Sequence, residues 1–244
     1  MTSQITYLKA MALLLMVLLA PPVSAATIVG VVSERSAAEL AAGAEQFAET
    51  YPDHRVMLRT PEQLARLEDR QLADLVSGAD ALLMAAVFGE QVGRLARVVS
   101  EQAEARSFPI LAVNGDRSLT RLSWLDGESP LAGLDDQTLN ELMAAPEPGA
   151  DVAKHNAVLR KQFPQQASWL DGRILYQGRT PEHLDALLRW LLVQADYDLE
   201  VPELPPRSLI RYYRDGEAMD DPRDLGLRAG PAVTLLDLDS GDRP

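Results

Sequence analysis

The sequence predicts an α/β domain whose sheet is mostly parallel and is covered by helices on both faces. Two observations support this fold class. Apolar, β-branched runs alternate with amphipathic segments in the order β-α-β-α-β-α-β through the first half of the chain. Some of these runs are apolar throughout, which is typical of strands buried on both faces. Right-handed crossovers would make the sheet doubly wound, of the flavodoxin or Rossmann type.

The first unit begins with Thr27 to Val32 (TIVGVV), which predicts a buried strand. Ser36, with Glu39 three residues later, has the pattern of a capping box and predicts the start of a helix. We expect that helix to end at Tyr51-Pro52-Asp53. His54 to Leu58 then predicts the second strand.

The next two units repeat this order. Thr60, followed by Pro61 at the first helical position and by Gln63, predicts a capped helix. Ala79 to Val87 predicts a central third strand, and Phe108 to Val113 predicts a fourth. The helix between them is indicated by apolar residues at helical spacing: Val92, Leu95, Ala96 and Val99.

The pattern is less regular after the fourth strand. Asp135 to Ala145 and Asp151 to Phe163 predict helices, and we interpret residues 118–170 as a helical insertion. Ile174 to Tyr176 predicts a fifth strand. Thr180-Pro181 then starts a helix with a well-defined apolar face, formed by Leu184, Leu187, Leu188, Leu191 and Leu192.

Residues 1–25 have the pattern of a signal peptide. Lys9 precedes the apolar run Ala10 to Ala20, and small residues follow, so we expect cleavage after Ala25, with cleavage after Ala26 as the alternative. The run is shorter than the roughly 20 apolar residues that a membrane-spanning helix needs. We therefore predict an exported, periplasmic or otherwise extracytoplasmic protein with no membrane span after cleavage.

The rest of the chain divides into two parts. Residues 26–198 are expected to form the α/β domain. Residues 199–244 are expected to form an extended, proline-rich tail with a strand-like stretch at Ala232 to Leu238. The tail cannot form a domain alone, so in a longer protein it would lead to a further domain.

Composition excludes several kinds of function. The formal net charge of −13 argues against binding to nucleic acid or to anionic lipid. The chain has no cysteine, which excludes thiol nucleophiles, disulfides, zinc fingers and iron–sulfur ligation. It also lacks GxGxxG, Walker and GxSxG motifs. No residue can be named as catalytic.

The three histidines, His54, His155 and His183, match no metal-binding motif. His155 lies four residues after Asp151 in a predicted helix, so the two side chains share a face and could hold one metal. An ordinary solvated helix face explains the same spacing. We interpret all three histidines as surface or partly buried residues and the tryptophans as packing residues.

Position in the fold predicts a site where motifs do not. Ligands of open α/β sheets bind outside the carboxyl ends of the strands, where the strand order reverses. We therefore expect a cleft lined by residues that follow the first, third and fourth strands: Ser33, Glu34, Phe88, Gly89, Asn114, Asp116 and Arg117. The alternative is that the helical insertion closes this edge of the sheet, and the sequence favours neither.

The second half of the chain resembles the CobN family, the large subunits of cobaltochelatase, which are related to the H subunit of magnesium chelatase. The segment Tyr176 to Leu184 (YQGRTPEHL) and the segment Leu187 to Leu192 (LLRWLL) carry this resemblance. A proline-rich stretch and an aromatic β-segment follow in the family, and here Pro202, Pro205, Pro206, Ile210, Tyr212 and Tyr213 fall in that order.

The likeness extends over about residues 27–244, since Ala79 to Gly89 and Phe108 to Asp116 also resemble that family's N-terminal α/β region. Two features depart from the family. Its subunits are several times longer, and its Tyr-His-Pro motif is absent because Arg214 follows Tyr213. The family's metal-insertion residues lie in later domains, so none can be assigned to this chain.

The resemblance implies an N-terminal domain, complete or as a fragment, of a protein that handles a metal–tetrapyrrole. In the family, cobalt is inserted into a corrinoid ring at the cost of ATP, which is hydrolysed by separate partner subunits. An exported relative would instead bind a corrinoid or porphyrin without nucleotide, alone or with chelatase partners. The alternative hypothesis is a noncatalytic periplasmic domain that docks onto an envelope protein.

Overall fold

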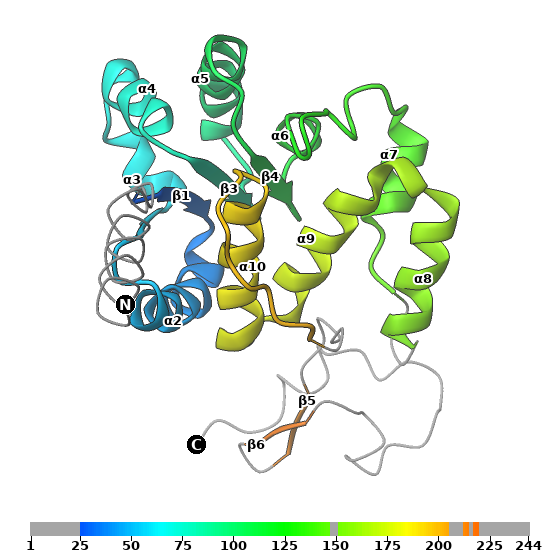
Figure 1. Ribbon diagram of the computed structural model, residues 1–244. Helices are drawn as coiled ribbons and strands as arrows, with labels where there is room; N and C mark the ends of the chain where they lie inside the picture. Colours follow the sequence, from blue (N-terminus) through cyan, green and yellow to red (C-terminus); the bar gives the residue numbers. More distant parts are fainter. Residues whose placement is uncertain (1–24, 147–150, 205–211, 215–216, 220–244) are drawn as a thin grey trace, which may run out of the picture.

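The computed structural model describes residues 25–146, 151–204, 212–214 and 217–219 (Figure 1). Most of the predicted signal peptide and the strand-like stretch 232–238 lie outside the described residues. Within the described part, a central parallel sheet is flanked by helices, and the predicted α/β fold class is confirmed.

The sheet contains β1 (Thr27–Val32), β2 (Arg55–Arg59), β3 (Ala81–Ala85) and β4 (Ile110–Val113). All neighbouring strands are parallel, and their order is β2-β1-β3-β4. These four strands were predicted. The bounds of β1 are as predicted, and most ends of the other three strands differ from the prediction by one or two residues. The strand order reverses between β1 and β3, so the topological switch point lies there.

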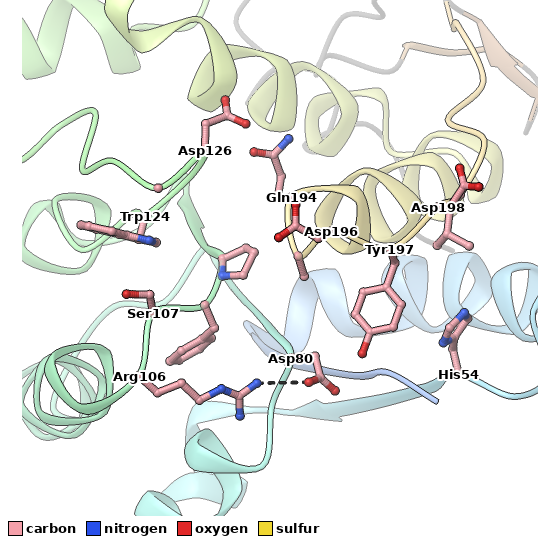
Figure 2. A pocket seen from close by; sticks show the side chains of 15 residues that line it. His54, Asp80, Arg106, Ser107, Trp124, Asp126, Gln194, Asp196, Tyr197 and Asp198 are labelled. Carbon is pink, nitrogen blue, oxygen red and sulfur yellow. Dashed lines mark hydrogen bonds and ion pairs between the residues drawn. The ribbon is translucent and has the colours of Figure 1, made fainter. Parts of the chain in front are cut away.

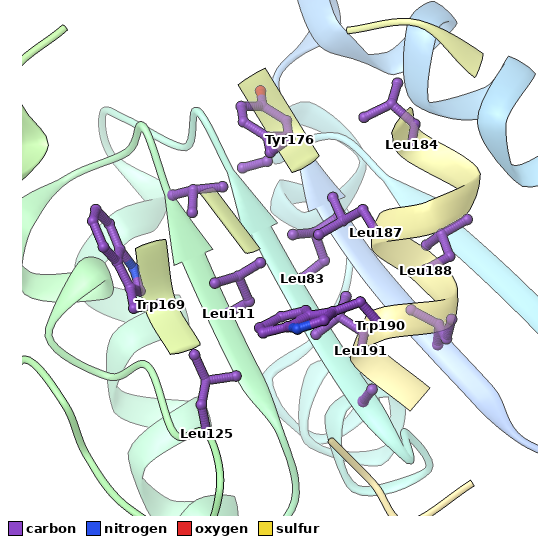
Figure 3. Packing of buried hydrophobic residues seen from close by; sticks show 14 of the residues in the cluster. Leu83, Leu111, Leu125, Trp169, Tyr176, Leu184, Leu187, Leu188, Trp190 and Leu191 are labelled. Atoms are coloured by element: carbon purple, nitrogen blue, oxygen red, sulfur yellow. The ribbon is translucent and has the colours of Figure 1, made fainter. Parts of the chain in front are cut away.

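One face of the sheet is covered by α2 (Glu34–Thr50), α9 (Ala167–Gly178) and α10 (Pro181–Val193). Alternate strand residues point toward these helices, as their period of two requires. Figure 3 shows Leu83 and Leu111 of the sheet, with Trp169 of α9 on one side and Trp190 and the leucines of α10 on the other. The Trp169 indole N–H donates to the Ala112 carbonyl at 2.9 Å, which joins α9 to β4.

α2 and α10 approach each other closely at Gly43. A Cβ atom at this position would lie 2.5 Å from Leu184 Cβ and 3.1 Å from the Leu184 carbonyl carbon. These are contacts with the stem and backbone of α10, which cannot rotate away. Gly43 therefore allows the two helices to share the buried face on which α10 presents the predicted leucine stripe.

The opposite face is covered by α3 (Pro61–Ala65), α4 (Asp69–Ser77), α5 (Gln91–Ala105) and the short α6 (Arg117–Thr120). The predicted capping box at Thr60 and Gln63 is confirmed, because each side chain accepts a hydrogen bond from the other's backbone N–H. The helix that starts there ends after one turn, and a second capping box at Glu68 and Gln71 starts α4.

Two predictions of local structure were wrong. Ser36 does not cap α2, which begins at Glu34 with Ser33 in the N-cap position, and the Ser36 hydroxyl instead contacts α9. Ile174 to Tyr176 is not a strand but part of α9. Only three residues suggested a strand, whereas the buried positions over the whole of α9 follow helical spacing. These positions include Trp169, Leu170, Arg173, Tyr176 and Gln177.

The region between β4 and α9 is helical or irregular, as predicted. It contains α7 (Asp136–Met143), α8 (Val152–Gln162) and the 3₁₀ turn Pro164–Gln166. Beyond α10, a two-stranded antiparallel ribbon pairs β5 (Tyr212–Arg214) with β6 (Glu217–Met219). In the described part of the chain, no helix has both the length and the apolarity required to cross a membrane.

Candidate functional site

A cavity of about 490 Å³ lies at the carboxyl ends of β3 and β4. It brings together four of the seven residues that the sequence predicts: Phe88, Asn114, Asp116 and Arg117. Ser33, Glu34 and Gly89 are not among the lining residues. The other walls come from the next loop residue, from α7 and the residues after it, and from α9: Gly115, Asn140, Met143, Ala145, Arg173 and Gln177. We call this the carboxyl-edge cavity.

The loops that follow β3 and β4 are held in unusual backbone conformations. Ala86 and Asn114 have positive φ angles of 55° and 51°, a backbone conformation that residues other than glycine and asparagine rarely adopt. The two loops are tied together because the Asp116 N–H donates to the Val87 carbonyl at 2.9 Å. The cavity therefore rests on a fixed loop pair rather than on isolated surface residues.

Asp116 faces the cavity but its carboxylate already has partners. It accepts hydrogen bonds from the Ser118 backbone N–H at 2.8 Å and from the Ser118 hydroxyl at 2.7 Å, as the N-cap of α6. These donors lower the pKa of Asp116 below its ordinary value, since both favour the ionised form. The structure thus gives Asp116 a capping role.

Arg173 is the most unusual residue of the cavity. Its side chain is only 1% exposed, and its guanidinium donates to the carbonyls of Leu142, Met143 and Ala144 at 3.1, 3.0 and 2.7 Å. With the Gln177 amide turned to accept, Arg173 Nε and Nη2 also donate to its oxygen, at 2.9 and 3.0 Å. These neutral oxygens hold the cation in place and close the end of α7.

No carboxylate among the described residues forms an ion pair with Arg173. Burial alone lowers its pKa, to about 10, so the guanidinium stays charged at neutral pH. A buried charge that is solvated only by carbonyl and amide oxygens remains electrostatically uncompensated. The second cation of the cavity, Arg117, is half-exposed and lies 3.7 Å from Asp136.

The switch point at the end of β1 is closed by the protein's own side chains. Arg179 Nη1 donates to the Ser36 hydroxyl at 2.8 Å and to Glu39 at 3.0 Å, and the Tyr176 hydroxyl lies 3.2 Å from the same Ser36 oxygen. Ser36 also contacts Ser33 at 3.2 Å. The arginine therefore lies at the start of α2, where a ligand of a doubly wound fold often binds.

The residues that cover the edge at β1, Tyr176 and Arg179, lie outside the predicted insertion 118–170, so the alternative that this insertion closes the edge is not what the structure shows there. The edge is closed at β1, by the end of α9, and it is open at β3 and β4. The open part combines two guanidinium groups with the amides of Asn114, Asn140 and Gln177. This donor-rich set is suited to hold an anion, and it contains no nucleophile paired with a base.

A larger cavity of about 760 Å³ lies at the opposite edge, beside the amino ends of β2, β3 and β4. Figure 2 shows Trp124 and Asp126 on one side of it and Tyr197 and His54 on the other, with the Asp80–Arg106 ion pair between them. We call this the amino-edge cavity. Sequence reasoning missed it, because its residues come from loops that precede strands or follow helices and form no motif.

The prediction that the three histidines are surface or partly buried is right only for His155, because His54 and His183 are buried. Two of the tryptophans pack in the core, as predicted. His183 is buried, its Nδ1 lies 2.8 Å from the Thr180 hydroxyl, and Trp169 and Trp190 lie in the core. His155 is partly buried beside Asp151, with no side-chain bond between the two. In the ranges that the structure describes, no three His, Asp or Glu side chains are grouped so as to hold a metal.

No protein-family model matches the chain. A search of the curated proteins also found no match. The resemblance to the CobN family therefore remains a prediction, and the function has to be argued from the two cavities.

Proposed function

We propose that this is a noncatalytic periplasmic binding domain for a tetrapyrrole that carries carboxylate side chains, such as a corrinoid acid or a porphyrin. One observation carries the proposal: Arg173 is a buried cation without a carboxylate partner among the described residues, and it lines the carboxyl-edge cavity. The family resemblance selects the tetrapyrrole among the anions that such a cavity would accept.

The electrostatic argument starts from the cost of burying Arg173. Neutral oxygens reduce that cost but leave the net charge, and a carboxylate in the cavity would neutralise it in a region of low dielectric constant. Arg117 adds a second, more accessible guanidinium. A guanidinium can bind a carboxylate through parallel hydrogen bonds, and Arg117 is placed to do so. Arg173 acts through its charge instead, because its Nε and Nη2 groups already donate to protein oxygens.

Phe88 supports a flat, apolar ligand. Its side chain is 60% exposed although it lines the cavity, so an aromatic ring is available at the rim. A macrocycle could stack on that ring while one of its carboxylates enters the cavity. The volume of about 490 Å³ is within the range of small-molecule sites, so it would hold part of a tetrapyrrole and leave the rest outside.

The test is a visible-absorption titration with hydrogenobyrinic acid diamide, a porphyrin and cobalamin, the last of which carries amides instead of free carboxylates. We expect a band shift with the two acids and a weaker response with cobalamin. No shift at tens of micromolar for any of them would refute the proposal. Fractionation and intact mass would test the location, with a periplasmic form that begins at Ala26 as the expected result.

Asn114→Asp is the matched variant for this titration. Asp has almost the same shape and tolerates the positive φ of 51° at this position, so only a negative charge is added to the cavity. We expect at least tenfold weaker binding of the acids. Gln46→Glu, which adds the same charge on the side of α2, should leave the binding unchanged.

A protein-docking domain is the second candidate, and the exposure of Phe88 favours it too. A photo-cross-linking amino acid at position 88 would distinguish the two. A single envelope protein cross-linked in cells, together with no tetrapyrrole shift, would support docking.

A further inference from the structure

We propose that the amino-edge cavity is a second ligand site, which takes a small organic cation: an ammonium or guanidinium group on a carbon skeleton that also carries a hydrogen-bond acceptor. This inference is independent of the proposed tetrapyrrole site. The two cavities lie at opposite ends of the strands and share no lining residue.

The charge of the cavity favours a cation. Four carboxylates and one arginine line it. Asp80 is already engaged, because it accepts from Arg106 at 3.1 Å and from the Thr27 N–H at 2.8 Å. The remaining negative charges are those of Asp126, Asp196 and Asp198, and all three residues are exposed to the cavity or its rim.

The backbone adds to this negative potential. α5 ends at Ala105 and α10 ends at Val193, and the residues directly after each helix line the cavity. The carbonyl ends of two helices therefore lie beside the same space. Helix C-termini carry partial negative charge and attract cations.

His54 adds a polar group to the wall of the amino-edge cavity. Only 8% of its surface is exposed, and its Nδ1 accepts the Ala26 N–H at 3.0 Å. In the neutral ring the proton is then on Nε2, and no described residue accepts a hydrogen bond from that atom. The ring lines the cavity, so this N–H is a donor for an acceptor on the ligand.

Gln194 provides a second polar atom without a partner. It follows α10 and lines the cavity, and its Oε1 is buried without a donor among the described residues. A buried acceptor of this kind costs about 1–3 kcal/mol when it is left unpaired. Because this atom is not accessible from the cavity, the Gln194 side chain has to rotate before an ammonium or guanidinium N–H on the ligand can supply the missing donor.

Aromatic side chains form the walls between these polar groups. Phe108, Trp124 and Tyr197 line the cavity, and the Arg106 guanidinium already lies 5.7 Å from the centre of the Phe108 ring. Aromatic faces attract organic cations more than hydrated metal ions. With its volume of about 760 Å³, the cavity has the size of a small-molecule site rather than an ion site.

The experiment titrates the full chain with arginine, argininamide and lysinamide, each of which carries a cation and a carbonyl or carboxylate acceptor, and follows binding by calorimetry and tryptophan fluorescence. Trp124 lines the cavity, whereas Trp169 and Trp190 are buried in the core. We expect binding with a dissociation constant below about 1 mM for at least one of these amines. The fluorescence change should disappear in Trp124→Phe while the calorimetric signal persists.

The charge variant is Asp126→Asn with Asp196→Asn. Both positions have positive φ, 53° and 64°, which asparagine tolerates, so the fold should be kept. We expect at least tenfold weaker binding. The control is Glu45→Gln with Asp74→Asn, which removes two exposed charges on α2 and α4 away from the cavity.

Two results would overturn the proposal. One is the absence of binding by all three amines up to about 1 mM. The other is equal weakening by the charge variant and by its control, which would mean that the amines respond only to the net charge of −13.

Discussion

The two ends of one parallel sheet carry cavities of opposite character. The carboxyl-edge cavity presents Arg117, Arg173 and side-chain amides, whereas the amino-edge cavity presents carboxylates and aromatic rings. The direction of the helices contributes to this difference. In a parallel α/β fold, helices begin at the carboxyl edge and end at the amino edge, so their dipoles favour anions at the first and cations at the second. Loop composition here reinforces that polarity.

The largest expected effect is a loss of stability of the whole domain, and so of both cavities. Gly43→Ala would place a Cβ 2.5 Å from Leu184 Cβ and close to the α10 backbone. Overpacking of this kind costs about 1–3 kcal/mol, with the upper end expected because backbone atoms cannot rotate away. Urea unfolding measures it. An unchanged midpoint would mean that α2 and α10 are not held at this distance.

Arg173→Met should affect the carboxyl edge alone. It removes the donors to Leu142, Met143, Ala144 and Gln177 and leaves buried oxygens unpaired, so we expect a loss of about 2–3 kcal/mol in unfolding free energy. The affinity for the tetrapyrrole should fall together with the stability, while the affinity for the amine should not change. Arg173→Lys keeps the charge and should retain more of the ligand affinity. An equal loss of affinity for both ligands would contradict the proposal that they bind at two separate sites.

His54→Phe is the corresponding test of the amino edge. Phenylalanine keeps the contacts with Phe47, Tyr51 and Tyr197 but leaves the Ala26 N–H without an acceptor, which costs about 1–2 kcal/mol. Amine binding should weaken and the tetrapyrrole spectrum should not change. Thermal denaturation and the two titrations measure this. Amine affinity equal to that of the wild type would exclude His54 from the site.

The smallest effect concerns pH at the carboxyl edge. The pKa of Asp116 is lowered in the folded state by the Ser118 hydroxyl and N–H. The contribution of Asp116 to the free energy of unfolding is therefore fully present above the pKa of the unfolded state, near 3.9. It is lost as the pH falls through the lowered pKa of the folded state. We expect Asp116→Ala, which removes the capping side chain, to cost about 1 kcal/mol at pH 7 and less at pH 2. A pH-independent difference would contradict the capping role.

The sequence predicted the parts of the molecule that depend on local patterns. Strands such as Thr27 to Val32 and the capping box at Thr60 could be predicted because apolar runs and caps act within a few residues. Ser36 could not be assigned correctly, since its partners Tyr176 and Arg179 are about 140 residues away in the sequence. Tertiary contacts of this kind overrode the local capping signal.

The residues of the candidate site were also predicted only in part. The rule for the carboxyl ends of strands predicts a ligand cleft, and the structure brings Phe88, Asn114, Asp116 and Arg117 together at one cavity but not Ser33, Glu34 and Gly89. That this cavity binds a ligand stays a prediction. The rule could not find Arg173, because this residue lies in α9 rather than in a loop that follows a strand, and part of α9 was predicted to be a strand. The amino-edge cavity had no comparable positional rule, and its carboxylates are scattered over separate loops.

The most direct test of opposite sites is a double titration of Asn114→Asp and of the Asp126→Asn, Asp196→Asn variant with a porphyrin and with argininamide. We expect the first variant to lose the porphyrin and keep argininamide, and the second to keep the porphyrin and lose argininamide. Loss of both ligands in either variant, or of neither ligand in both, would contradict the assignment of the two ligands to opposite sites.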